Sequence, residues 1–453
     1  MKSKLYLVIL CSFLFFSCGK DNSPTVEDQE QKFSEVIISS PQEIRNVAFA
    51  IVNVNVIAMI QTDEVLTEQT VIVDGGLISW IGPSANATIP AGTQVIDAAN
   101  KGYLIPGMAD MHFHRSTGSD LFLFTANGVT VAREMWGSKG MLDIRDQILD
   151  EKLDLPQFFV ASPGMNGAGG AWEQFTPPVT DPNDARSLVK QYKEEGFDFV
   201  KVYNKLEPSV YAAIIDEAEL QGIRVIGHVP AKVSPETVMI SGQATTEHFL
   251  GFGYFASSKN TVSNGVLNES KVAELATMSV ENNVRHVATI EVDVHSPSDI
   301  AEVRNSEEYN YISDHLKNTF ENGFHQGSST AEQALINNYQ IIDALKAAGS
   351  KLLLGTDAGF GYILPGFSVH DELAHFVQAG LSNYEALETA TVHPAEFLEM
   401  ADVIGTVEAG KRADLVLLES NPLEDIANVQ DRAGVVLRGT WLSEKVLREE
   451  VKK

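Results

Sequence analysis

The chain has 453 residues, with 33 Lys and Arg against 61 Asp and Glu, and a formal net charge of −28. This length predicts two or three folding units, or one large barrel with additions. The acidic excess argues against binding to nucleic acid or to an anionic membrane surface, because both rely on Lys and Arg. The two cysteines, Cys11 and Cys18, both lie near the N-terminus. If that segment is removed, the body has no disulfide scaffold, iron–sulfur cluster or catalytic cysteine.

The N-terminus is typical of an export signal. Two lysines precede the apolar run Leu5–Phe16, which is too short to span a bilayer but fits the core of a signal peptide. Cys18 then follows in a context that resembles a bacterial lipoprotein signal, with an ordinary secretory signal as the alternative. We expect residues 1–17 to be a signal peptide and residues 18–45 a lipidated polar tether. The mature protein would be a membrane-anchored lipoprotein in the periplasm or on the bacterial cell surface.

The body begins with β-type runs and then alternates between strands and helices. Val47–Ile60 and Thr70–Ile81 alternate in hydrophobicity, which predicts strands. After Gly102 the predicted strands are Tyr103–His112, Val129–Glu134, Phe158–Ser162, Phe197–Val202, Arg224–His228, Ala244–His248, His286–Val292 and Leu352–Thr356. The predicted helices between them include Asp184–Glu195, Pro208–Leu220, Ala331–Ala348 and His370–Ala379.

This alternation predicts an α/β fold, a (β/α)8 TIM barrel over residues 101–400. Residues 46–100 and 401–453 are expected to form a small β-sandwich domain from both chain ends, because Gly405–Ser420 and Ala433–Leu442 return to strand character. Two long segments after the sixth and seventh strands, Phe249–Asn283 and Asp293–Gly327, are predicted to be functional loops at the rim that carries the active site.

Two histidines end the first strand of the predicted barrel. His112 and His114 are two residues apart, so on a strand both imidazoles point to one side and are able to share a metal. Taken alone, this spacing is a weak signal, and two core or surface histidines are the alternative. Asp110 shares the face of His112, and we expect it to orient that imidazole.

Lys201 lies inside an apolar strand, where a buried ammonium is costly unless it is paired or neutralised. One interpretation is a lysine that reaches solvent at the strand end. The other is a neutral lysine that adds CO2, which gives a carbamate able to bridge two cations. Tyr203 follows on the same face and is either an oxyanion donor or a tyrosine packed at the rim.

His228, His248 and Asp357 end three further predicted strands, at the rim where barrel chemistry takes place. Each alone has a structural explanation. As an ordered set, four histidines, a carboxylate-like Lys201 and an aspartate suit two zinc-like ions with open positions for water. They predict hydrolysis by metal-activated hydroxide, with Asp357 as acid/base.

Five motifs, PGMADMHFH, DFVKVY, GHVP, TTEHF and GTDAG in that order, resemble the amidohydrolase superfamily. Within it they are similar to the branch of imidazolonepropionase-like and prolidase-like (Xaa-Pro dipeptidase-type) enzymes. The segment GTVEAGKRADLV is also similar to the usual end of these chains. The resemblance therefore covers about Val47 to Leu442 and implies a metal-dependent hydrolase of C–N bonds.

The resemblance also implies roles for single residues. His112 and His114 would hold the more buried of two divalent ions, His228 and His248 the other, and carboxylated Lys201 would bridge them. Asp357 would ligate the first ion and serve as acid/base. In many relatives a glycine-rich turn after the third strand contains a histidine, but Asn166–Trp172 has none. His295 is a candidate substrate contact, with a surface-loop histidine as the alternative.

Three functions remain open. The first is a binuclear hydrolase of a dipeptide or N-acyl amino acid. The second is a mononuclear deaminase or a cyclic-amide hydrolase of the imidazolonepropionase type, against which Lys201 argues. The third is a non-catalytic metal-binding lipoprotein. The expected partners are a small-molecule or dipeptide substrate and a membrane reached through Cys18, with a homo-oligomer as a further possibility and no nucleic acid.

Overall fold

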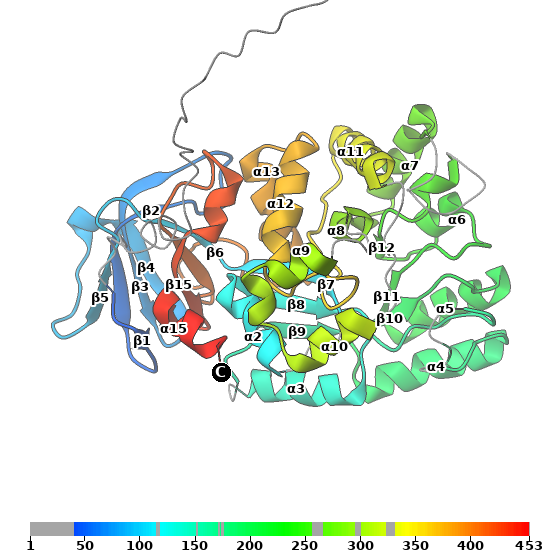
Figure 1. Cartoon of the computed structure of the whole chain (residues 1–453), viewed down its shortest axis with the longest axis horizontal. Helices are drawn as coiled ribbons and strands as arrows, with labels where there is room; N and C mark the ends of the chain where they lie inside the picture. Colours follow the sequence, from blue (N-terminus) through cyan, green and yellow to red (C-terminus); the bar gives the residue numbers. More distant parts are fainter. Residues whose placement is uncertain are drawn as a thin grey trace, which may run out of the picture. The chain divides into compact units, whose positions relative to one another are not determined.

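Strands from both ends of the chain form one mixed β-sheet. The computed structural model describes residues 40–114, 118–150, 153–170, 173, 176–255, 266–294, 300–322 and 331–452. The nine strands of this sheet are β1 Glu43–Ile44, β2 Phe49–Val56, β3 Leu66–Asp74, β4 Leu77–Pro83, β5 Gln94–Asp97, β6 Tyr103–Pro106, β14 Leu415–Leu418, β15 Arg432–Leu437 and β16 Thr440–Ser443. Their order is β1-β16-β15-β14-β6-β2-β3-β4, with β5 beside β2, so N-terminal and C-terminal strands lie side by side (Figure 1).

The mixed sheet has a hydrophobic core of its own. Its strands bury Phe49, Val71, Ile96, Leu415 and Trp441 in one cluster. A prediction of strands at both ends of the chain was therefore possible from their alternating hydrophobicity, because one face of such a sheet packs on a core.

The middle of the chain forms parallel sheets. One contains β7 Met108–Phe113, β8 Val129–Glu134 and β9 Gln157–Val160; the other contains β10 Phe199–Val202, β11 Arg224–Gly227, β12 Thr245–Glu247 and β13 Arg285–Val287. Single parallel bridges continue the order: Ala161↔Phe199 and Met165↔Val202 join β9 to β10, Val287↔Leu353 joins β13 to the segment after α11, and Phe113↔Ala358 joins that segment to β7. Strands β7, β8, β10 and β12 are buried at every residue, as expected for parallel strands covered on both faces.

Helices connect the parallel strands. The α-helices are α2 Gly118–Ala126, α3 Lys139–Leu149, α4 Pro182–Glu195, α5 Pro208–Gln221, α6 Pro235–Ile240, α7 Glu269–Glu281, α8 Ile290–Val294, α9 Ile300–Asn305, α10 Asp314–Asn322, α11 Ala331–Ala348, α12 Ser368–Gln378, α13 Asn383–Ala390, α14 Val392–Phe397 and α15 Glu444–Glu450. Helix α4 begins earlier than predicted because the Asp181 side chain accepts hydrogen bonds from the first turn and Pro182 occupies the first position. Gly196, at φ 91°, ends it.

The first predicted barrel strand, Tyr103–His112, is two strands in the structure. Residues 103–106 are β6 of the mixed sheet, whereas β7 begins at Met108 in a parallel sheet. Gly107 separates them, and a Cβ atom there would lie 2.3 Å from the Thr130 hydroxyl oxygen. The chain therefore passes from one sheet to the other at a point of close backbone approach, which a run of apolar letters does not reveal.

The seventh and eighth predicted strands are shorter than expected. Of His286–Val292 only the first residues belong to β13, and helix α8 begins at Ile290. Leu352–Thr356 is not a regular strand, although Leu353 donates to the His286 carbonyl and Met111 donates to the Leu354 carbonyl. At Gly355 this segment passes close to β7, since a Cβ there would lie 2.8 Å from the His112 backbone nitrogen.

The two segments predicted as long loops contain helices. The first, 249–283, includes α7, and the second, 293–327, includes α9 and α10. Helix α7 buries Val272 and Leu275 in the main core, so an amphipathic helix was overlooked there. Among the described residues, no helix is long and apolar enough to cross a membrane.

Candidate active site

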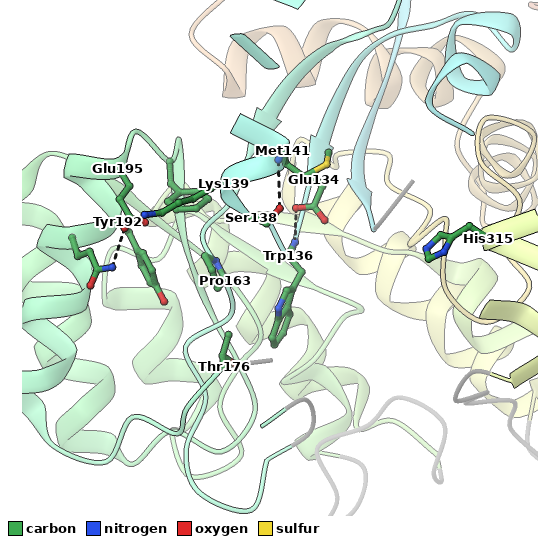
Figure 2. Close-up of a pocket in the computed structure, with 13 residues that line it drawn as sticks. Glu134, Trp136, Ser138, Lys139, Met141, Pro163, Thr176, Tyr192, Glu195 and His315 are labelled. Carbon is green, nitrogen blue, oxygen red and sulfur yellow. Dashed lines mark hydrogen bonds and ion pairs between the residues drawn. The ribbon is translucent and has the colours of Figure 1, made fainter. Parts of the chain in front are cut away.

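A cavity of about 650 Å3 lies beside the end of β8 (Figure 2). Glu134, the last residue of β8, lines it together with Trp136 and Lys139. Helix α4 contributes Tyr192, and His315 of α10 lines the cavity as well. His315 belongs to the second long segment, so a helix of that segment contributes to this cavity.

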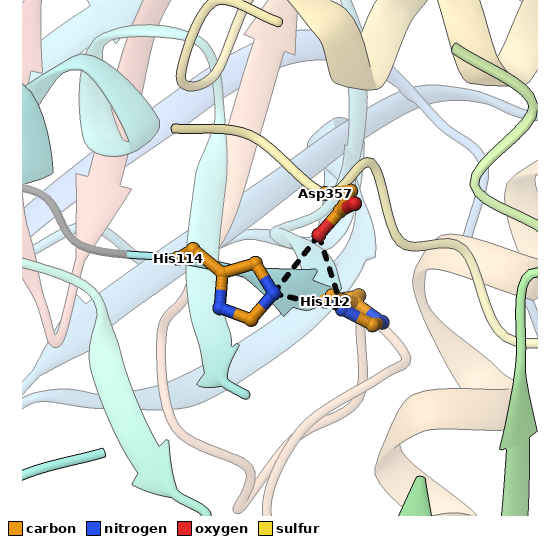
Figure 3. Close-up of side chains that lie close together, drawn as sticks. All are labelled: His112, His114 and Asp357. Carbon is orange, nitrogen blue, oxygen red and sulfur yellow. Dashed lines mark hydrogen bonds and ion pairs between the residues drawn. The ribbon is translucent and has the colours of Figure 1, made fainter. Parts of the chain in front are cut away.

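Three of the predicted metal ligands meet at the ends of β7 and of the segment that follows α11. The His112 and His114 Nε2 atoms lie 3.3 Å apart, and the Asp357 Oδ1 atom lies 3.2 Å from the first and 3.0 Å from the second (Figure 3). Burial opposes ionisation of Asp357, but the two imidazoles outweigh it and hold the pKa of this carboxyl well below its usual range. Three donor atoms that converge in this way are able to hold one metal ion.

His228 and His248 lie next to this group. The His248 ring centroid is 4.8 Å from that of His112 and 4.9 Å from that of His228. Burial lowers the pKa of His248 to about 3 and that of His228 well below its ordinary value. Both imidazoles are therefore neutral near pH 7, which is the form that binds metal.

Each of three imidazoles is oriented by a partner on its Nδ1 atom. The Nδ1 of His112 lies 2.9 Å from Glu247 Oε2, and the Nδ1 of His228 lies 2.6 Å from Asn204 Oδ1. The Nδ1 of His248 lies 2.6 Å from the Thr289 hydroxyl, which itself donates to the Ala288 carbonyl. Because these partners accept, Nδ1 carries the proton and Nε2 presents its lone pair to the centre.

Lys201 is fully buried on β10. Its Nζ atom has no hydrogen-bond partner among the described residues, and burial lowers its pKa to about 8. Gly227, at φ 124°, makes room for it, since a Cβ there would lie 3.0 Å from Lys201 Cδ. A buried amine without a partner fits a lysine that is modified or that binds a ligand.

Tyr203 reaches the site through its contact with His228. The centroid of the Tyr203 ring lies 4.0 Å from that of His228 and 5.2 Å from that of Trp136, which it meets edge to face. An aromatic row thus connects the cavity with a histidine of the site. His295 and Cys18 lie outside the described residues.

The residue that orients His112 is Glu247 and not Asp110. Asp110 accepts hydrogen bonds from the backbone N–H groups of His112 and Thr356 and from the Thr356 hydroxyl. The prediction that Asp110 orients the His112 imidazole was therefore wrong. The Asp110 carboxylate instead holds the backbone of the site by accepting from its N–H groups. Asp110 and His112 are two positions apart on a strand and therefore share a face. Which residues of other strands each side chain contacts depends on the register of those strands.

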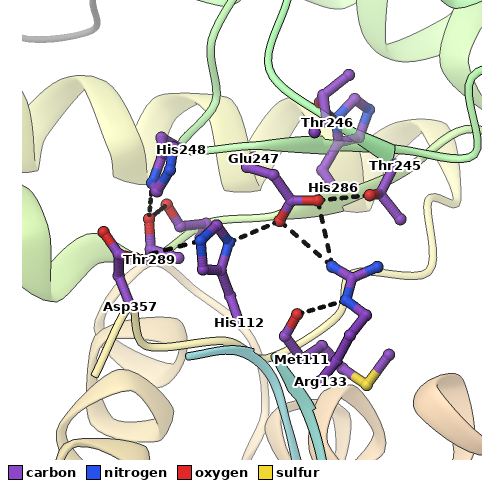
Figure 4. A network of polar contacts seen from close by, with 12 residues as sticks. Met111, His112, Arg133, Thr245, Thr246, Glu247, His248, His286, Thr289 and Asp357 are labelled. Atoms are coloured by element: carbon purple, nitrogen blue, oxygen red, sulfur yellow. Dashed lines mark hydrogen bonds and ion pairs between the residues drawn. The ribbon is translucent and has the colours of Figure 1, made fainter. Parts of the chain in front are cut away.

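Sequence reasoning missed a buried pair that supports the site. Glu247 and Arg133 are both fully buried, and the Arg133 Nη2 atom lies 3.2 and 3.3 Å from the two Glu247 oxygens (Figure 4). Burial opposes ionisation of Glu247, yet the Arg133 charge and the hydrogen bond to His112 outweigh it and lower its pKa. The two charges were visible in the sequence, since Arg133 lies within an apolar strand and Glu247 directly precedes His248, but their pairing was not.

The donor atoms of this site are of the kind that divalent metal ions accept. Four imidazoles, one aspartate and one buried amine supply nitrogen and oxygen atoms, which are the ligand types that zinc accepts. Three residues of the site also have left-handed backbone, since His248, Thr289 and Asp357 have φ of 59°, 51° and 64°. Such left-handed backbone in non-glycine residues is a frequent mark of functional sites.

Comparison with known proteins identifies the family. A model of the amidohydrolase family matches residues 108–442, which is well over half of the chain, so the chain belongs to this family. Members generally use divalent metals, and the convergence of His112, His114 and Asp357 agrees with this. A metal-dependent hydrolase of C–N bonds is thereby supported at the level of the family.

Solved structures share the fold along almost the whole chain. A Xaa-Pro dipeptidase with bound methionine is 21% identical with a TM-score of 0.66 and covers 87% of this chain and 100% of that chain. Bottromycin amidohydrolase is 23% identical with a TM-score of 0.69, and the match covers 92% of this chain and 90% of that chain. Ochratoxinase of A. niger is 18% identical with a TM-score of 0.64, and the match covers 88% of this chain and 96% of that chain.

Curated relatives match over short segments only. Adenine deaminase 3 of Rhizobium meliloti (strain 1021) is 36% identical over 59 residues, 13% of this chain and 10% of its own length. An adenine deaminase of Paracoccus denitrificans (strain Pd 1222) is 24% identical over 149 residues, 28% of this chain and 23% of its own length. The chain thus spans less than a quarter of the length of these relatives.

Proposed function

We propose that this chain hydrolyses the amide bond of a dipeptide or an N-acyl amino acid at a centre of two divalent metal ions, with zinc as the ion that its nitrogen and oxygen donors fit. The observation that carries the proposal is Lys201, a fully buried amine without a hydrogen-bond partner among the described residues, next to histidines whose Nε2 atoms face the centre. Carboxylation of Lys201 would remove the cost of a buried amine and supply two bridging oxygens.

The proposed ligands form two groups around that lysine. His112, His114 and Asp357 would hold one ion and His228 and His248 the other. The metals, when bound, would supply an acidic water and polarise the scissile carbonyl. The seven parallel strands and the bridged segment 352–358 would form the (β/α)8 barrel whose strand ends carry this centre.

The protein's own groups would handle the proton and the substrate. Asp357, held between two imidazoles, would take a proton from water and deliver it to the leaving amine. Tyr203 would donate its hydroxyl to the oxyanion that forms on the carbonyl. The cavity beside Glu134 and Trp136 would receive a substituent of the substrate, and the structural similarity to a Xaa-Pro dipeptidase favours a peptide-like one.

Metal analysis combined with a substrate library tests this function. Purified protein should contain close to two ions per chain and hydrolyse members of a library of dipeptides and N-acyl amino acids. Lys201→Ala should lower the metal content and abolish hydrolysis, whereas Lys190→Ala, which changes a half-exposed lysine on α4, should leave both unchanged. One ion per chain together with full activity of Lys201→Ala would contradict the two-metal mechanism.

A deaminase is the second candidate, because local similarity to adenine deaminases is present. Ammonia release from adenine, without hydrolysis of any library member, would favour it. A metal-loaded protein inert in both assays would instead support the third candidate, a non-catalytic metal-binding lipoprotein.

We further propose that the protein is exported and anchored to a bacterial membrane through lipid on Cys18, on the basis of the N-terminal sequence. Labelling of the full-length chain with radioactive palmitate in a bacterial host tests it. The label should appear in the wild type and be lost in Cys18→Ala, and an unlabelled wild type would contradict the anchor.

A further inference from the structure

Helix α8 begins directly after Thr289, the residue that orients His248. The Thr289 hydroxyl lies 2.6 Å from the His248 Nδ1 atom (Figure 4), and the Thr289 backbone has a φ of 51°. A β-branched residue seldom adopts left-handed backbone, and such a conformation persists only where the surrounding structure holds it. The place of the His248 partner therefore depends on what holds the turn at Thr289.

Helix α8 does not hold this turn by itself. It has only the five residues Ile290–Val294, and a helix this short is not stable without tertiary contacts. The N–H groups of its first turn have no partner within the helix. They donate instead to a side chain of α12, from Ile290 to Glu372 Oε1 at 3.0 Å and from Glu291 to Glu372 Oε2 at 3.3 Å. Glu372 thus holds the start of α8.

The Glu372 carboxyl is costly to place in this position. It is fully buried, and burial raises its pKa well above the usual range, although the N–H groups of Ile290 and Glu291 oppose this shift. An apolar side chain would fill the same space without that cost. The hydrogen bonds to α8 therefore account for a carboxyl here better than packing does.

A second contact joins the same two helices. His375 lies one turn further along α12, and its Nε2 atom is 3.1 Å from Glu291 Oε1. The Nδ1 atom of the same imidazole is 2.9 Å from the Tyr339 hydroxyl on α11. Glu291 is therefore held through both its N–H group and its carboxylate, which leaves α8 little freedom to move relative to α12.

We propose that Glu372 is a positioning residue of the metal site: it holds the first N–H groups of α8, this fixes the turn at Thr289, and Thr289 fixes the His248 imidazole. The inference rests on the metal centre proposed above, in which His248 is a ligand. Without the Glu372 hydrogen bonds, Thr289 would leave the left-handed region and His248 would lose its acceptor. The effect of Glu372 on His248 thus passes through Thr289.

The zinc affinity of chelator-treated protein, measured by competition with a chelator, tests the inference without any substrate. Glu372→Gln keeps the length of the side chain but replaces one acceptor oxygen by an NH2 group, and it should weaken zinc binding by about 10-fold. The decisive measurement is a double-mutant cycle with Thr289→Val, which removes the acceptor itself. In the Thr289→Val background, Glu372→Gln should have no further effect on zinc affinity. The matched control Glu217→Gln changes another buried glutamate, on α5, and should bind zinc as the wild type does.

Other outcomes separate the possible errors. Losses that add in the double variant would show that Glu372 supports the fold in general and would overturn the inference, as would wild-type zinc affinity in Glu372→Gln. A wild type that binds no zinc would overturn the metal centre itself, and this inference with it. If Glu372→Gln does not fold, as judged by circular dichroism, Glu372→Met removes the buried carboxyl and should show the same lack of additivity with Thr289→Val.

Discussion

Replacing Lys201 by methionine should stabilise the metal-free protein. Methionine has a similar length and no charge, and the Lys201 Nζ atom has no hydrogen-bond partner among the described residues. Burial lowers the pKa of this amine from 10.5 to about 8. At about 1.4 kcal/mol for each pH unit, the difference corresponds to roughly 3 kcal/mol of stability lost by the wild type near neutral pH.

The same difference predicts a pH dependence with a definite sign. Between pH 8 and pH 10.5 the folded protein has released the Lys201 proton while the unfolded chain still holds it. The unfolded state then binds more protons, so the wild type gains stability as the pH rises through this window. Lys201→Met lacks this gain, and its advantage should shrink towards the upper end of the window.

Urea unfolding of chelator-treated protein measures both effects. The wild type, Lys201→Met and the control Lys190→Met would be compared at neutral pH and at about pH 10, with CO2 excluded. In the presence of zinc the order should reverse, because the variant lacks one proposed ligand and metal binding therefore stabilises the wild type more. Equal stability of the metal-free proteins at neutral pH, or a difference that does not change with pH, would refute the reasoning.

Three further predictions concern single side chains of the site. Asp357→Asn should lower kcat by about 100- to 10,000-fold while circular dichroism stays unchanged, and a smaller loss would argue against its role as acid/base. Thr289→Val removes the acceptor on His248 Nδ1 and should weaken zinc binding by about 10- to 100-fold in a chelator competition; unchanged affinity would show that this bond is dispensable. Trp136→Ala removes an aromatic wall of the cavity and should lower kcat/KM by about 10-fold for dipeptides with large side chains, and an equal loss for small ones would contradict a role in specificity.

The main features of the site were predictable because they depend on local pattern. His112 and His114 share a face of one strand, and Lys201 is conspicuous as a charged residue in an apolar run. Glu247 could not be assigned a partner, since its contact with His112 spans 135 residues and both faces of a parallel strand are buried. Its role depends on which side chains meet across the interior, and the sequence carries no local signal for that.

Helices and strands were predicted correctly where the hydrophobic period is regular. Their ends were missed where the backbone makes a close approach or has a positive φ. Helix α11 agrees with its predicted bounds, Ala331–Ala348, and strand β8 agrees with Val129–Glu134. The apolar run across Gly107 hid a change of sheet, because only a close approach to Thr130 makes the break. The run after His286 became a helix because the backbone turns at Thr289, with a φ of 51°.

Strand β14, which lies between β6 and β15, has a consequence for the order of folding. Its partner β6 is more than 300 residues earlier in the chain, with Leu415 opposite Pro106, so the sheet is completed only after nearly the whole polypeptide has emerged. Pairing over such a separation is slow. A chain cut before β14 would leave β6 as an open edge that invites aggregation, beside the glycine that leads into the strand of His112. Removal of the C-terminal segment from β14 onwards would thus disturb β7, the strand that carries His112.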